Sequence, residues 1–267
     1  MSGVPETPVT PAAAPASAFS ITLTELRFAD PFRWLAAGWR DFRRAPGIGL
    51  FYGACFAAMG WLLLKAFQNA PAWTVALSAG FLLVGPFMCI GLYDVSRKLE
   101  RGERPDLGDS LTAWDTKIGT MAIFGAVLLV LEMIWARASL VVFALSFDGM
   151  PDFKGSLLKL LDPENLGFIV AYLGVGGLFA GLIYAISVVS IPMILDRQTD
   201  AITAGLTSLR LCLTQPGVML LWGALITLLV VLALLPFFLG LLVIGPVLGH
   251  ASWHAYRAAV AAELAPR

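Results

Sequence analysis

Residues 211–256 read LCLTQPGVMLLWGALITLLVVLALLPFFLGLLVIGPVLGHASWHAY and contain no Asp, Glu, Lys or Arg. One continuous helix over these 46 residues would be roughly 69 Å long, about twice the thickness of a bilayer's hydrocarbon core. We therefore predict that the stretch crosses a membrane twice and turns near Pro236. The chain is a polytopic membrane protein, and this property alone does not reveal what it does.

The composition of the whole chain agrees with a membrane location. Its 267 residues are 58% apolar and 13% charged, whereas soluble proteins carry about 25% charged residues. The 18 basic and 18 acidic residues balance, which gives no electrostatic reason to expect nucleic-acid binding. Residues 1–25 are rich in Ala and Pro, so we predict a disordered cytoplasmic tail before a transmembrane domain at 26–267.

The apolar segments predict an all-α fold, a polytopic bundle of six transmembrane helices. Of the basic residues near the span ends, 14 fall on one side of the membrane and 4 on the other. Because basic residues accumulate on the cytoplasmic side, we predict that both termini are cytoplasmic. The predicted spans are 47–66, 74–95, 118–147, 166–195, 216–235 and 237–258.

Three of the predicted spans begin with one shared pattern of eight residues, which we call the octad. The octads starting at Gly47, Gly119 and Gly217 have Gly first, and an aromatic residue, Gly and Ala at positions six to eight. A short amphipathic segment precedes each octad, and a proline-containing span follows it. We predict a unit used three times, in which a short interfacial helix leads into a transmembrane hairpin.

Small residues predict where these helices meet. In lipid, apolar burial cannot drive helices together, so association depends on close approach of their backbones. We predict helix packing at the seventh octad position, which is Gly53, Gly125 or Gly223, and at the G-x-x-x-G formed by Gly177 and Gly181.

Four sequence blocks together resemble an uncharacterised bacterial family, the predicted integral membrane proteins of domain-of-unknown-function family 2189. The resemblance covers about residues 30–262 and implies six helices in a bacterial inner membrane, with no established activity. More distantly, the chain is similar to the membrane domains of glycerophosphodiester phosphodiesterases, which implies a lipid-related role by analogy. The four blocks are 36–44, 91–103, 191–197 and 249–257.

Glu132 is the most unusual polar residue of the predicted spans. It lies 15 residues after Lys117, which places it roughly 22 Å into the third span, beyond the midplane. An ionisable group at this depth usually faces other helices and is a candidate functional residue. It is either a neutral structural glutamate or a partner of Ser187, Ser190 or Tyr184. Arg137, five residues later, is expected to extend to the periplasmic headgroups.

His250 and His254 are the only histidines, and their i, i+4 spacing places them on one helix face. A metal site would need further ligands, and no cluster of Cys, His and Asp supplies them. With Trp253 and Tyr256 beside it, we interpret His254 as part of an interfacial belt near the cytoplasmic headgroups. We predict no metal and no cofactor.

No motif of a known catalytic site occurs in the chain. We therefore predict that the protein is not an enzyme but an accessory or scaffold protein of the bacterial inner membrane, which binds lipid or other membrane proteins. One alternative is a small transporter or channel with Glu132 in a central cavity. Another is a factor associated with a haem or copper oxidase of the respiratory chain, which would use His250 and His254.

The predicted orientation can be tested by cysteine labelling in intact cells. A cysteine introduced near Asp152, in the loop from Asp148 to Glu164, should react with a membrane-impermeant maleimide, because this loop is predicted to be periplasmic. A cysteine near Glu103 should react only after the cells are lysed. The opposite pattern would reverse the orientation.

Overall fold

This computed structural model describes residues 18–69, 71–146 and 163–260, most of which lie in helices. The structure describes only the backbone at residues 67, 71–79, 82, 83 and 164. The helices are α1 (Asp30–Arg44), α2 (Pro46–Asn69), α3 (Pro71–Glu100), α4 (Leu107–Thr112), α5 (Ile118–Ser146), α6 (Leu166–Ser187), α7 (Ser190–Asp196), α8 (Ala201–Thr214), α9 (Pro216–Leu234) and α10 (Leu241–Ala259), with short 3-10 turns at Asp115–Lys117 and Pro163–Asn165.

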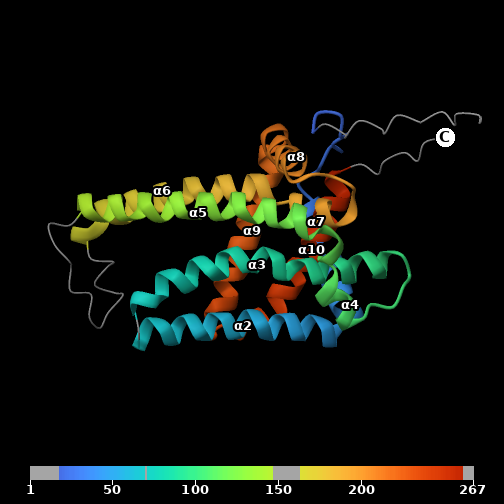
Figure 1. The fold of residues 1–267 in the computed structure, drawn as a ribbon, viewed down its shortest axis with the longest axis horizontal. Coiled ribbons are helices and arrows are strands. Elements are labelled where there is room, and N and C mark those ends of the chain that lie inside the picture. The colour runs from blue at the N-terminus through green and yellow to red at the C-terminus, as the bar shows by residue number, and fades with distance from the viewer. Residues whose placement is uncertain (1–17, 70, 147–162, 261–267) are drawn as a thin grey trace, which may run out of the picture.

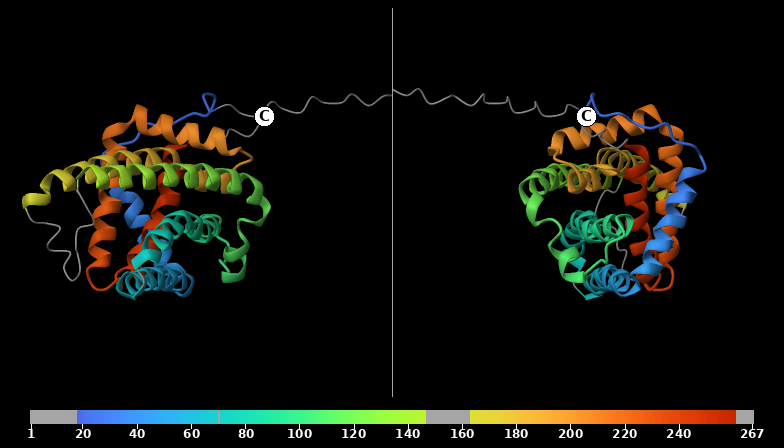
Figure 2. Two further views of the ribbon diagram at one scale, coloured as in Figure 1. Left: turned by 60° about the vertical axis from the view of Figure 1, so that its left-hand side comes forward. Right: turned by 90° about the vertical axis from the view of Figure 1, so that its right-hand side faces the viewer.

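The long helices form three hairpins. In Figure 1 the α2–α3 hairpin and the α5–α6 hairpin run in the same direction and lie in two adjacent layers. The α9–α10 hairpin runs across this direction, as the end-on view of the other hairpins in Figure 2 makes clear. The predicted helices are therefore present, but they do not form one bundle of six parallel spans.

Four stretches of the described residues are long and apolar enough to cross a membrane, by length and composition. They are Pro46–Ala66, Leu107–Ser146, Leu166–Asp196 and Pro216–Leu234, and they fall within α2, α4–α5, α6–α7 and α9. The predicted spans 74–95 and 237–258 coincide largely with α3 and α10, but are not among the four. The C-terminal half of α10 carries His250, His254 and Arg257, which lower its hydropathy.

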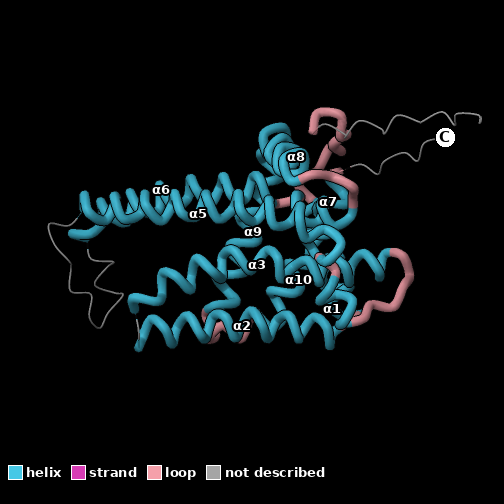
Figure 3. The backbone as a smooth tube through the Cα atoms, in the orientation of Figure 1, coloured by secondary structure: helices cyan, strands magenta, loops and turns pink. Residues whose placement is uncertain are grey.

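Two prolines separate short helices from the long helices that follow. Ala45 and Gln215, the residues before Pro46 and Pro216, have nearly the same backbone angles, φ −132° and ψ 58° in one case and φ −131° and ψ 55° in the other. A residue that precedes proline is disfavoured in the helical region, so α1 and α8 end there and the chain turns into α2 and α9. Figure 2 shows α1 turned away from the direction of α2, and Figure 3 shows α8 nearly end-on.

Close glycine contacts place α10 against both α1 and α2. A Cβ atom at Gly38 of α1 would lie 2.5 Å from the carbonyl oxygen of Val247, and one at Gly53 of α2 would overlap the backbone of Leu242. Without these Cβ atoms the helix backbones approach closely, so that α1 packs alongside α10 and α2 crosses it (Figure 2). Both contacts depend on positions where only glycine fits.

Each octad glycine faces a helix of a different hairpin. Gly53 of α2 lies against α10, as described above. A Cβ atom at Gly125 of α5 would be 3.0 Å from the ring of Phe87 in α3, and one at Gly223 of α9 would be 3.4 Å from the ring of Tyr184 in α6. The first hairpin therefore contacts the third, the second contacts the first, and the third contacts the second.

The aromatic residues at the sixth octad position connect the units in the opposite order. Tyr52, Phe124 and Trp222 are buried, and each contacts the short helix that precedes the next hairpin. The hydroxyl of Tyr52 lies 3.1 Å from that of Ser110 in α4, and Phe124 would be 3.8 Å from a Cβ atom at Gly205 in α8. The ring of Trp222 meets Trp34 of α1 edge to face, with centroids 5.5 Å apart, which closes the circle.

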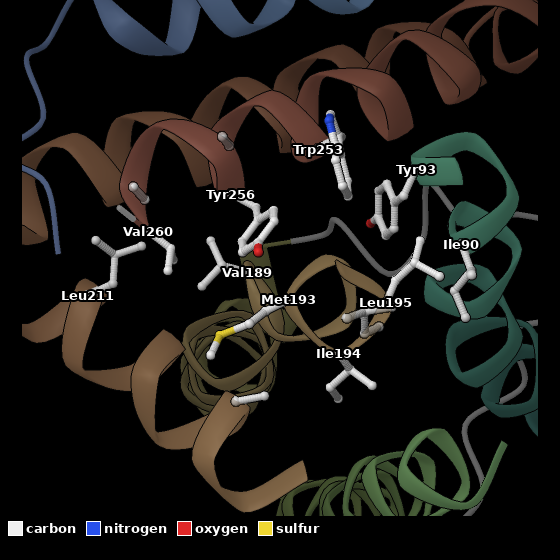
Figure 4. Packing of buried hydrophobic residues seen from close by; sticks show 14 of the residues in the cluster. Ile90, Tyr93, Val189, Met193, Ile194, Leu195, Leu211, Trp253, Tyr256 and Val260 are labelled. Atoms are coloured by element: carbon white, nitrogen blue, oxygen red, sulfur yellow. The ribbon is translucent and has the colours of Figure 1, made fainter. Parts of the chain in front are cut away.

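The apolar core lies where the short helices meet the hairpins. Residues 190–195 of α7 are all buried, and Figure 4 shows Met193, Ile194 and Leu195 among side chains of α3, α8 and α10. Of the segment predicted to be a disordered tail, residues 1–17 lie outside the described residues. Residues 18–25 pack against this core, where Arg210 donates to the carbonyls of Ala18 and Ile21 and Leu23 pairs with Val260.

The contact at Gly53 should be sensitive to side-chain size. We expect Gly53→Leu to lower the free energy of unfolding in detergent by about 1–3 kcal/mol, the usual cost of overpacking, because the backbone of Leu242 cannot move aside. Gly47→Leu is the matched control on α2, since a Cβ atom there meets nothing within 4 Å in the described structure. Thermal unfolding followed by circular dichroism measures both. Equal melting temperatures for the two variants would contradict the packing role.

Candidate functional site

A buried polar network joins α1, α3 and α10. His254 Nε2 lies 2.7 Å from Asp41 Oδ2, and Ser96 Oγ lies 2.8 Å from His250 Nδ1. Ser96 and His250 are 0% exposed and Asp41 is 5% exposed. These pairs connect helices that are far apart in the sequence. A buried polar group must keep its hydrogen-bond partner, so such pairs hold the helices in one arrangement.

The Asp41 carboxyl is held in its ionised form. Its burial alone would raise the pKa, but the hydrogen bond and charge of His254, the hydroxyl of Ser96 and the charge of His250 together lower the pKa below its ordinary value. Asp41 is therefore a carboxylate at neutral pH and accepts a hydrogen bond from His254.

A second polar cluster joins α3, α7 and α10. The hydroxyl of Tyr256 donates to Asp196 Oδ2 at 2.7 Å and accepts from Arg197 Nε at 2.9 Å. Trp253 Nε1 donates to Glu100 Oε2 at 3.1 Å. The prediction of an interfacial belt was wrong for these residues, because Trp253 and Tyr256 are 1% and 0% exposed and use their polar atoms inside the protein.

The charged residues at the end of α3 tie this helix to its neighbours. Asp94 is buried and pairs with Arg97 at 2.5 Å and with Lys98 at 3.3 Å. Arg97 also donates to the carbonyl of Leu195 in α7 at 3.3 Å, and Lys98 reaches Asp109 of α4 at 2.7 Å. Cations at the end of a helix complement its dipole, and here Arg97 and Lys98 also contact two other helices.

Sequence reasoning missed Asp41 and Ser96 as members of the network. A signal for Asp41 existed, because it lies three and four residues after Gly38 and Ala37, on the face of α1 that is buried. An acidic residue on the apolar face of an amphipathic helix needs a partner. Ser96 carried no comparable signal, since serine is common inside membrane helices.

The contacts of the network indicate that it stabilises the packing of α1, α3 and α10. Its polar side chains mostly find partners within the protein, although His250 Nε2 has no hydrogen-bond partner among the described residues. Within the same residues, no group of three or more His, Cys, Asp and Glu side chains could hold a metal ion. The two histidines that were considered as ligands are instead bonded to Ser96 and Asp41.

Glu132 is buried on α5, at 8% exposure, on the helix face that also carries Met121, Phe124 and Leu128. Its three predicted partners use their hydroxyls elsewhere. These hydroxyls donate to backbone carbonyls, Ser187 to Ile183 at 2.6 Å, Tyr184 to Met219 at 2.7 Å and Ser190 to Ala204 at 3.1 Å.

Glu132 Oε2 therefore has no hydrogen-bond partner in the described part of the chain. Arg137, the other candidate of this span, is exposed.

A cavity of about 620 Å³ lies between α2, α3, α4 and α5. Its walls are almost entirely apolar, and the hydroxyls of Tyr52 and Ser110 bond to each other within it. Glu132 does not line this cavity. The structure thus separates the deep carboxyl from the cavity, two features that a proton-coupled transport site would combine.

The Asp41–His254 contact should give a stability that depends on pH. A carboxyl whose folded-state pKa is lowered stabilises the fold above its ordinary pKa of 3.8, and this contribution disappears as the pH falls through the lower folded value. We expect Asp41→Asn to lower the free energy of unfolding by about 1–3 kcal/mol at pH 7 and by less at pH 3.

The control for this variant is Asp115→Asn, at an exposed position. Thermal unfolding in detergent at both pH values measures the two effects. A loss for Asp41→Asn that is the same at pH 7 and pH 3 would show that the charge of the carboxylate contributes nothing.

The comparisons with known proteins show a family match over part of the chain. No curated protein and no solved structure matches the chain, and the expected similarity to glycerophosphodiester phosphodiesterases is not shown. The match to a family model is shorter than the resemblance predicted over residues 30–262, but it confirms that resemblance. Residues 74–196, from α3 to the end of α7, match the family described as predicted integral membrane protein (DUF2189).

Proposed function

We propose that this chain is a non-enzymatic accessory protein of a bacterial inner membrane that scaffolds other membrane proteins through α6. The observation that carries the proposal is the free face of this helix. No residue of α6 is buried, and a Cβ atom at Gly177 or Gly181 would meet nothing within 4 Å in the described structure. A G-x-x-x-G face without an internal neighbour is suited to a helix of another protein.

The proposal includes six spans built as three repeated units, with both termini in the cytoplasm. The circular order of contacts at the octads supports the repeat, because equivalent positions on α2, α5 and α9 meet equivalent elements of a neighbouring unit. The 14 to 4 distribution of basic residues supports the orientation. α3 and α10 would then pair with α2 and α9 as returning spans. This requires the α9–α10 hairpin to align, in a membrane, with the two hairpins that it crosses in Figure 2.

The two alternative functions have less support. A transporter with Glu132 in a central cavity needs that carboxyl beside the substrate, whereas the cavity of about 620 Å³ is lined by other residues. A haem or copper role needs several ligands at one place, whereas His254 Nε2 is bonded to Asp41 and no group of three His, Cys, Asp or Glu side chains gathers around His250 in the described residues.

Site-specific cross-linking tests the scaffold role. A photoreactive amino acid in place of Leu178 on α6 should capture a discrete membrane protein in intact membranes. The same group in place of Leu220 on α9 is the matched control, since the two leucines are 72% and 71% exposed. Adding Gly177→Trp should abolish capture at Leu178, because the indole prevents close approach. Identical products at both positions, or capture unaffected by Gly177→Trp, would contradict the proposal.

Glu132→Gln separates the scaffold from a transporter. The amide keeps the shape of the side chain, so a structural glutamate should tolerate the change with unaltered capture at Leu178 and an unaltered melting temperature. A proton-coupled transporter would lose pH-dependent flux with Gln and keep part of it with Asp.

A further inference from the structure

The cavity between α2, α3, α4 and α5 is elongated along the helices. On α5 its lining runs from Ile118 to Leu129, which at 1.5 Å per residue is about 16 Å. On α3 it runs from Val84 to Gly91. The length is close to half of the roughly 30 Å hydrocarbon core of a bilayer, so the cavity has the depth of one leaflet.

The two ends of the cavity differ in chemistry. One end lies beside the charged residues Asp94 and Lys117 in the sequence, and there Tyr52, Ser110 and Trp114 line it. The other end, at Val84 and Leu129, lies among apolar residues of α3 and α5. Trp114 is 44% exposed, and an exposed tryptophan favours the level of the lipid headgroups. With the neighbouring charged residues, it places the first end at the membrane surface and the second inside the bilayer.

The cavity is also open to the side. Val84, Leu129 and Ile118 line it and are 43%, 43% and 54% exposed, so its wall continues into the outer surface of α3 and α5. α5 lies within the candidate span Leu107–Ser146, whose apolar surface needs a lipid environment. The medium at the opening is therefore the hydrocarbon of the bilayer.

Water is a poor occupant of this space. A buried water molecule needs two to four polar partners, and the hydroxyls of Tyr52 and Ser110 already bond to each other at 3.1 Å. An empty apolar space beside lipid would lose the dispersion contacts that an inserted chain supplies. A flexible apolar chain from the adjoining leaflet needs no polar partners and supplies these dispersion contacts.

We propose that this cavity is a binding site for one acyl chain of a membrane phospholipid, with the ester end of the chain near Tyr52, Ser110 and Trp114 and its methyl end near Val84 and Leu129. The site depends on the membrane location in the proposed function but not on the scaffold face of α6. Most of the residues that line the cavity lie within 74–196, the part of the chain that matches the family model. The proposal therefore names a class of ligand for that part of the chain.

Photolabelling of the full-length protein in nanodiscs tests the proposal. The nanodiscs contain phosphatidylcholine, a fraction of which carries a diazirine in one acyl chain, and mass spectrometry locates the adducts after irradiation. We expect severalfold more adducts on residues 84–91 and 118–129 than on the exposed leucines of α9, such as Leu220 and Leu228. Adducts spread evenly over α3, α5 and α9 would overturn the proposal, since they would reflect only general contact with lipid.

Filling the cavity provides the matched comparison. Ala126→Phe places a ring in the cavity, whereas Ala224→Phe adds the same ring at the equivalent octad position of α9, which is exposed and outside the cavity. Labelling of residues 84–91 should fall severalfold in the first variant and stay unchanged in the second. Ala122→Phe, also in the lining, replaces Ala126→Phe if that variant does not fold. Equal labelling in all variants would overturn the site.

Competition with a free fatty acid that carries no diazirine distinguishes the two sources of an acyl chain. Added in excess, the unlabelled fatty acid should leave phospholipid labelling of the cavity unchanged. Displacement of the phospholipid adducts would show a fatty-acid site and overturn the assignment to phospholipid. Cross-linking at Leu178 is read independently, so the lipid site and the scaffold function can fail separately.

Discussion

Close approach of helix backbones at glycine is the constraint on which the rest of this structure depends. Lipid removes the hydrophobic drive for helices to associate, and what remains is the dispersion energy of surfaces that touch along their length. At Gly38 and Gly53, α1 and α2 come so near to α10 that any Cβ atom would strike backbone. These contacts hold α10 alongside α1 and against α2 where it crosses the first hairpin (Figure 2), and this crossing places the polar half of α10 in the middle of the protein.

The buried polar groups follow from that crossing. Once His250, His254 and Tyr256 lie inside the protein, each needs a partner, because an unpaired polar group in an apolar interior is costly. Ser96, Asp41 and Asp196 supply these partners from α3, α1 and α7. Polar groups of one helix thereby fix the positions of three others. In this arrangement the only histidines of the chain serve as ties between helices, and chemistry on a substrate would compete with the contacts that hold the fold.

The sequence predicted the helices well and their mutual arrangement poorly. Long apolar runs and the prolines at 46 and 216 locate α2 and α9 within a few residues, because hydropathy and backbone sterics act locally. The crossing of α9–α10 over the other hairpins could not be predicted, since a glycine marks a possible contact without naming its partner. Tyr256 illustrates the same limit, because an aromatic residue near a span end fits both a headgroup belt and a buried hydrogen bond to Asp196.

The octads connect the local pattern with the whole fold. A repeated segment can meet its copies in a circle only if the last copy contacts the first, and here Trp222 of the third octad meets Trp34 of α1. The three octads nevertheless differ where their contacts differ. Gly53 meets a backbone, so its contact is tight, whereas Gly125 and Gly223 meet the rings of Phe87 and Tyr184, which hold the helices further apart. The apolar cavity lies beside Gly125, where the spacing is wider. The same octad pattern therefore brings α2 and α10 close together and leaves α3 and α5 further apart.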